Sequence, residues 1–187
     1  MVDPELGKKL ADAAGEYANA AIAAFKVPGG VHPPTVVAAC ARMAGTSLFR
    51  SFELRLPGVE PGQAVLSKEA DEHAPMLLGV AARILANRGI VLPSSPPGPV
   101  VDDKARPTLG FLETQRRLEP LFSPIQARHA LSLRQAAQAS AIAVALLIHH
   151  FARHLPPITA FGLAAFAFIE GSKTAPDPGT LDGTSAR

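Results

Sequence analysis

Apolar residues recur at intervals of three and four along much of the chain, and this spacing predicts helices. No segment alternates apolar and polar residues over the length of a strand, so we expect an all-α fold. The first predicted helix follows Asp3, which caps its amino end, and it stops at the turn-forming residues 27–30. Its apolar stripe consists of Leu6, Leu10, Ala13, Tyr17, Ala20 and Ala24.

Two further helices are predicted in the first half of the chain. One runs from Thr35 to Phe52, has an apolar face, and is closed by a proline and a glycine shortly afterwards. The next begins after Ser67, which acts as its N-cap, and continues to residues 87–89. We expect Pro75 to kink or divide this segment, because a proline inside a helix removes one backbone hydrogen bond and clashes with the preceding turn.

The longest predicted helix lies in the second half of the chain. Ser123, Pro124 and Gln126 combine a capping side chain, a first-turn proline and a glutamine that can complete a capping box. The apolar pattern then continues to His154, where a pair of prolines follows. A helix over this segment would be roughly 46 Å long, so we expect it to be the central element of the fold.

The remaining segments complete one domain. Residues 90–107 are rich in proline and predict a long surface loop, which a short helix over residues 108–119 follows. A last apolar helix is predicted over residues 158–170. We therefore expect a single-domain bundle of five or six helices, residues 1–171, and a disordered C-terminal tail, residues 172–187.

The middle of the predicted long helix is apolar on every side between Ala136 and Ile148. The simplest interpretation is the interior of a helical core. A second is a homo-oligomer or a protein complex, in which Ile142 and Leu146 meet the partner. A third is contact with a membrane surface, through a hairpin that includes residues 158–169. Both apolar runs are shorter than the ~20 residues that cross a bilayer, so we expect a soluble protein.

Two pairs of potential metal ligands stand at helical spacing. His150 and His154 lie four residues apart, and so do Glu69 and His73. If the two pairs meet across the bundle, they form a site for zinc or another divalent transition metal. The histidines are explained equally well without a metal, because positive side chains stabilise the carboxyl end of a helix.

The charges are nearly balanced, with 18 Lys+Arg against 16 Asp+Glu, but they are unevenly distributed. No acidic residue lies between Glu119 and Glu170. A modest basic series consists of Arg116, Arg117, Arg128 and Arg134. Its simplest interpretation is a solvated helical face, and the alternative is a contact site for an anionic molecule or a partner protein. Tryptophan is absent and tyrosine occurs once, so nucleic-acid binding is not favoured.

The sequence lacks the motifs of the common enzyme classes, including the Gly-x-Ser-x-Gly elbow, the dinucleotide and Walker loops and paired Cys-x-x-Cys. Cys40 is the only cysteine, and residues 1–5 do not resemble the start of a signal peptide, so we expect a cytoplasmic protein. The leading prediction is a non-catalytic helical protein that acts by association with itself or with a protein partner. A metal-binding bundle, with or without enzymatic activity, and a helical hairpin at a membrane surface remain alternatives.

Overall fold

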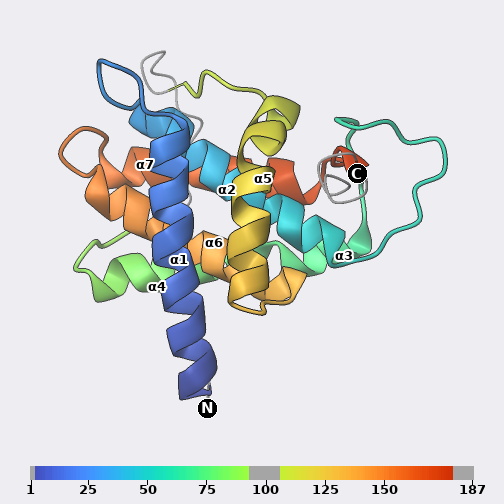
Figure 1. Ribbon diagram of the computed structural model, residues 1–187, viewed down its shortest axis with the longest axis horizontal. Helices are drawn as coiled ribbons and strands as arrows, with labels where there is room; N and C mark the ends of the chain where they lie inside the picture. Colours follow the sequence, from blue (N-terminus) through green and yellow to red (C-terminus); the bar gives the residue numbers. More distant parts are fainter. Residues whose placement is uncertain (1–2, 93–105, 179–187) are drawn as a thin grey trace.

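Seven helices make up the part of the chain that the computed structural model describes, residues 3–92 and 106–178 (Figure 1). No strand occurs in these residues, which contain only two isolated bridges, and the prediction of an all-α bundle is confirmed. Residues 93–105 of the predicted loop and 179–187 of the predicted tail lie outside the description. The helices are α1 (Pro4–Ala24), α2 (Pro33–Arg50), α3 (Lys68–His73), α4 (Pro75–Asn87), α5 (Phe111–Arg128), α6 (Leu133–His150) and α7 (Pro157–Ser172).

The predicted helix starts after Asp3 and Ser67 are confirmed, whereas α2 begins at Pro33 and ends at Arg50, two residues before each predicted bound. The Asp3 carboxylate accepts a hydrogen bond from the backbone N–H of Glu5, at 3.0 Å, and caps α1. The Ser67 hydroxyl accepts from the N–H of Ala70, at 3.1 Å, and caps α3. Pro75 divides the third predicted helix into α3 and α4, as its missing N–H group requires.

The central element is α2, and not the predicted long helix. Of its 18 residues only Pro33, Ser47 and Arg50 are not buried, and it packs against α5, α6 and α7. Small residues let these neighbours approach closely. A Cβ atom at Gly45 would lie only 2.6 Å from the carbonyl oxygen of Phe168 on α7, so the two helices touch through their backbones.

The prolines of α5 lie inside the helix and not at its ends. α5 continues through Pro120 and Pro124 to Arg128, so the predicted end at Glu119 and the predicted start at Ser123 are wrong. The two prolines are exposed and four residues apart, so both rings project from the same outward side of the helix. The opposite side packs on the core and holds the helix in place through Leu118, Phe122 and Ile125.

A later capping sequence begins the next helix. α6 starts at Leu133, where the Gln135 N–H donates to the Ser132 hydroxyl and the Gln135 side chain accepts from the Ser132 N–H. α6 ends at His150, and its axis is inclined at 113° to that of α5. The predicted single helix reaching His154 is therefore two helices joined by a sharp turn.

α1 and α5 lie on one side of α2 and α6, whereas α7 lies on the other side of α2 (Figure 1). The ring of Tyr17 on α1 stacks on that of Phe122 on α5, with centroids 4.4 Å apart. α4 packs on α6. Because α7 packs mainly against α2, its far side has no helix of the described chain against it.

The described C-terminal segment, residues 173–178, is held by backbone hydrogen bonds. The N–H of Gly62 donates to the carbonyl oxygen of Ala175 at 2.8 Å, and the N–H of Val65 donates to that of Lys173 at 2.7 Å. The predicted disorder from residue 172 therefore does not hold for this segment, because its backbone polar groups have partners in the loop after α2.

Candidate functional site

An arginine lies inside the bundle, where its charge needs a partner. Arg42 is on α2, and only 10% of its side chain is exposed. Its Nε donates to a carboxylate oxygen of Glu170 on α7, at 2.6 Å, and another guanidinium nitrogen donates to the carbonyl oxygen of Leu109, also at 2.6 Å. Since an unpaired buried charge is strongly destabilising, this ion pair fixes the rotation of α7 with Glu170 facing α2.

A second arginine–glutamate pair joins the carboxyl end of α2 to α5. The Arg50 Nε lies 3.0 Å from a carboxylate oxygen of Glu119, and both side chains are almost fully buried. The other carboxylate oxygen of Glu119 accepts from the side-chain amide of Gln115 at 2.8 Å. The carboxylate thus has a partner for each of its oxygens.

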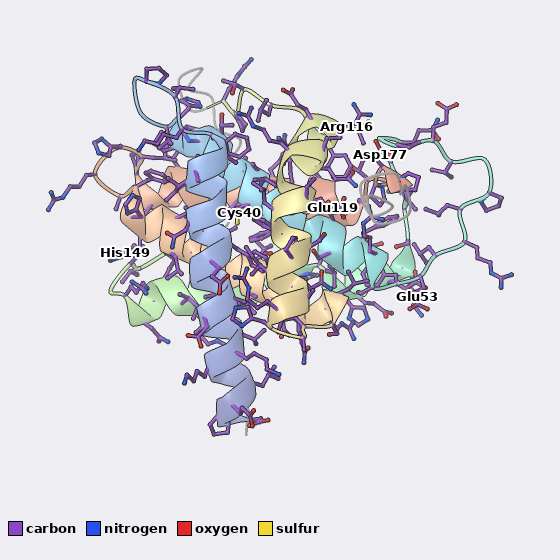
Figure 2. All side chains as sticks on the ribbon, viewed as in Figure 1. Cys40, Glu53, Arg116, Glu119, His149 and Asp177 are labelled. Atoms are coloured by element: carbon purple, nitrogen blue, oxygen red, sulfur yellow. The ribbon has the colours of Figure 1, made fainter. Side chains whose placement is uncertain are left out.

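The same polar groups hold the C-terminal segment at Asp177. The Asp177 N–H donates to the side chain of Gln115 at 2.9 Å, and the Asp177 carbonyl oxygen accepts from Gln115 at 3.0 Å and from Arg50 at 2.9 Å. Its carboxylate lies 3.1 Å from the Nε of Arg116. Figure 2 shows Arg116, Glu119 and Asp177 close together beside α5. These bonds connect the segment to both α2 and α5.

The side of α7 that faces away from α2 carries no charge. Glu170 is the only charged residue of this helix, and it is turned inward to Arg42. Phe166 is 70% exposed, and Ile158 and Ile169 are each 46% exposed. Phe166 lies eight residues after Ile158 and three before Ile169, and these spacings place the three side chains on one side of the helix. We call this surface the outer face of α7; it consists of Ile158, Gly162, Ala165, Phe166 and Ile169.

The residues predicted for interaction do not form such a surface. Ile142 and Leu146 on α6 are half-buried and pack against the core. Arg128 lies 3.1 Å from a carboxylate oxygen of Glu16 on α1, in an exposed ion pair that links α1 to α5. Arg134 is exposed at the start of α6. The apolar stretch of α6 between Ala136 and Ile148 is therefore part of the core, which is the simplest of the three interpretations.

The residues predicted to bind a metal are not brought together. Glu69 and His73 are on α3, where the His73 ring stacks on Phe52 with centroids 5.9 Å apart. His150 ends α6 and packs edge-on against the next residue, and His154 lies in the turn that follows. No group of three or more His, Cys, Asp or Glu side chains in the described ranges is placed to hold a metal ion.

Cys40 lies in the middle of the molecule, as Figure 2 shows. Its thiol is fully buried and donates a weak hydrogen bond to the carbonyl oxygen of Ser140, with a sulfur–oxygen distance of 3.8 Å. Burial raises the pKa of this thiol well above its ordinary value, since the surroundings disfavour the thiolate. The side chain therefore acts as a small core residue and not as a nucleophile.

Described residues line an open cavity at each of two places in the molecule. The larger of these, about 430 Å³, lies between the end of α2, residues 53–61 and the C-terminal segment. The smaller, about 310 Å³, lies between α1, α6 and the end of α4, and is bordered by His149 and His150. Figure 2 shows His149 on the side of the molecule opposite Asp177.

The membrane test gives a limited result. Over the described residues, no helix is by itself long and apolar enough to cross a bilayer. α5 and α6 meet the length and composition criteria only as a pair, across their 113° bend.

Comparison with known proteins assigns no family. No family model, no curated protein and no solved structure matches the chain. The functional argument therefore rests on the geometry of this chain alone.

The sequence predictions missed both buried ion pairs, although the sequence contains a signal for them. Glu119 and Glu170 are the two acids that bound the long acid-free interval. Glu170 stands alone in an apolar helix, and Arg42 lies among alanines and other small apolar residues. A single charge in such surroundings indicates a buried residue with a charged partner elsewhere in the fold.

Proposed function

We propose that the protein acts by self-association, with the outer face of α7 as the contact between two copies. The observation that carries this proposal is the exposure of Phe166, which is 70% accessible on a helix side without any charge. Aromatic residues are enriched at protein contacts and supply much of their binding energy. The two isoleucines beside it extend the apolar surface along the helix.

The composition of the outer face favours a second copy as the occupant. In a two-fold symmetric contact the same patch meets itself, so a charged residue near the symmetry axis would approach its own copy. The outer face has no charged residue, and a symmetric contact therefore brings no like charges together. Gly162 and Ala165 are small and lie between the larger side chains, which leaves room for the Phe166 ring of the other copy.

This surface takes the place of the one predicted from the sequence. Ile142 and Leu146 are half-buried and pack against the core, so they offer a partner less apolar surface than Phe166 does. The non-catalytic interpretation of the chain is retained, and the contact moves from α6 to α7.

The substitution Phe166→Asp tests the proposal. Burying the exposed part of this ring contributes about 1–2 kcal/mol in each copy, and a symmetric contact buries two rings. The substitution should therefore raise the dimer Kd by roughly 30- to 1,000-fold. Size-exclusion chromatography with light scattering, over a range of protein concentrations, measures this change. Leu66→Asp is the matched control, since Leu66 is 86% exposed but lies in the loop before α3.

We expect the wild type and the Leu66 variant to form dimers and the Phe166 variant to stay monomeric. A wild type that stays monomeric at every concentration would contradict self-association. Equal dimerisation of all three proteins would place the contact elsewhere on the molecule.

A further inference from the structure

The larger cavity is a groove with apolar walls where α2 ends. It has a volume of about 430 Å³ and is open to solvent. Small-molecule sites usually have volumes of 300–1,000 Å³ and are lined mainly by apolar side chains with a few polar groups. The apolar side chains here come from three parts of the chain, and they include Phe49, Leu54, Leu56, Val59, Leu133 and Pro176.

Two charged residues line the groove, and only one of them has its charge available. Arg50 already pairs with Glu119 at 3.0 Å and donates to the Asp177 carbonyl oxygen. Glu53 is exposed, and its carboxylate forms no hydrogen bond or ion pair with any residue in the ranges 3–92 and 106–178. It lies three residues beyond Arg50, the last residue of α2, and the carboxyl end of a helix carries a partial negative charge. The charges at the groove therefore favour a cation beside Glu53.

The backbone of Glu53 has an unusual conformation. Its φ angle is 52°, in the left-handed region, which costs about 1–2 kcal/mol for a residue with a side chain. Leu54, Leu56 and Val59, which follow Glu53 in the chain, line the groove. Strained backbone is concentrated at binding sites. A glycine would adopt this conformation without strain, but it would leave the groove without its carboxylate.

We propose that this groove binds a small organic cation, namely an amine with an aliphatic or aromatic body. The apolar body lies against Leu54, Leu56 and Val59, and the ammonium group pairs with the Glu53 carboxylate. The site is separate from the outer face of α7 and does not depend on self-association.

Titration with phenethylammonium, and in parallel with the neutral 2-phenylethanol, tests this site. Two-dimensional NMR of the ¹⁵N-labelled full chain follows the amides of Leu54, Val59 and Ala175, which line the groove, and that of Asn19, which does not. We expect saturable shifts of the three groove amides with both compounds and no shift of Asn19. The cation should bind more tightly than the alcohol.

The charge is tested with Glu53→Gln, and Glu60→Gln is the matched control because Glu60 is an exposed acid of the same loop outside the groove lining. Glu53→Gln should weaken phenethylammonium binding about two- to fivefold, as expected for an exposed ion pair, and leave 2-phenylethanol binding unchanged. Retained alcohol binding also shows that the variant keeps its groove. Absence of saturable groove shifts, or equal weakening of the cation by both substitutions, would overturn the proposal.

Discussion

Removal of Glu170 should destabilise the protein far more than removal of an exposed acid. Glu170→Ala leaves the Arg42 guanidinium, 10% exposed, without its counter-ion. Breaking a fully buried ion pair costs about 3–5 kcal/mol, and because a quarter of the Glu170 side chain is exposed we expect about 2–4 kcal/mol here. That loss is a large part of the 5–15 kcal/mol typical of a whole domain. Urea unfolding followed by circular dichroism at pH 7 measures the free energy of unfolding.

Two further variants separate the ion pair from general damage to α7. Glu72→Ala removes one partner of an exposed pair, 3.5 Å from Lys68, and should cost no more than about 0.5 kcal/mol. The double variant Arg42→Met/Glu170→Met replaces both charges with apolar groups, so it should be more stable than Glu170→Ala. The reasoning is refuted if Glu170→Ala costs less than about 1 kcal/mol, or if the double variant is no more stable than Glu170→Ala.

Two other predictions concern close packing and the buried titratable groups. Gly171→Ala should destabilise strongly, because its Cβ would overlap the carbonyl oxygen of Arg42. Gly79→Ala on α4 meets no atom within 4 Å and should stabilise the protein by about 0.5–1 kcal/mol, and thermal unfolding compares the two variants. Burial raises the pKa of the Cys40 thiol and that of the Tyr17 hydroxyl, so the unfolded chain loses these protons first as the pH rises. The free energy of unfolding should therefore fall above about pH 9, by up to ~1.4 kcal/mol per pH unit for each group. Cys40→Ala should make this fall with pH shallower. If the variant shows the same slope of unfolding free energy against pH, the assignment to the thiol is contradicted.

Local signals in the sequence predicted the helices of the first half well. A cap depends on residues two or three positions apart, so Asp3 and Ser67 are identified without knowledge of the fold. The division at Pro75 likewise follows from the chemistry of one residue. These elements are decided by neighbours along the chain.

The second half shows where local signals fail. Ser123 and Ser132 each precede a glutamine by three residues, yet only Ser132 forms the capping box. Packing of one side of α5 against the core holds the helix through Pro120 and Pro124 in spite of their missing N–H groups. Tertiary contacts decide which of two similar signals is used.

The contacts that orient α7 could not be predicted, since they join distant parts of the chain. Arg42 and Glu170 are 128 positions apart. The sequence shows that α6 and α7 are both apolar. It does not show that neighbouring helices cover α6 and leave one side of α7 exposed, because that depends on how the helices pack. Ile142 is turned to the core and Phe166 to the outside, and neither residue type nor spacing distinguishes them.

Hydroxyl-radical footprinting of the wild-type chain tests the central claim most directly. Oxidation of Phe166 is measured by mass spectrometry at a protein concentration below that at which dimers form and at one above it. Burial in a dimer should protect Phe166 at the higher concentration and leave Leu66, in the loop before α3, equally oxidised at both. If Phe166 is oxidised to the same extent at both concentrations, the outer face of α7 is not the contact between copies.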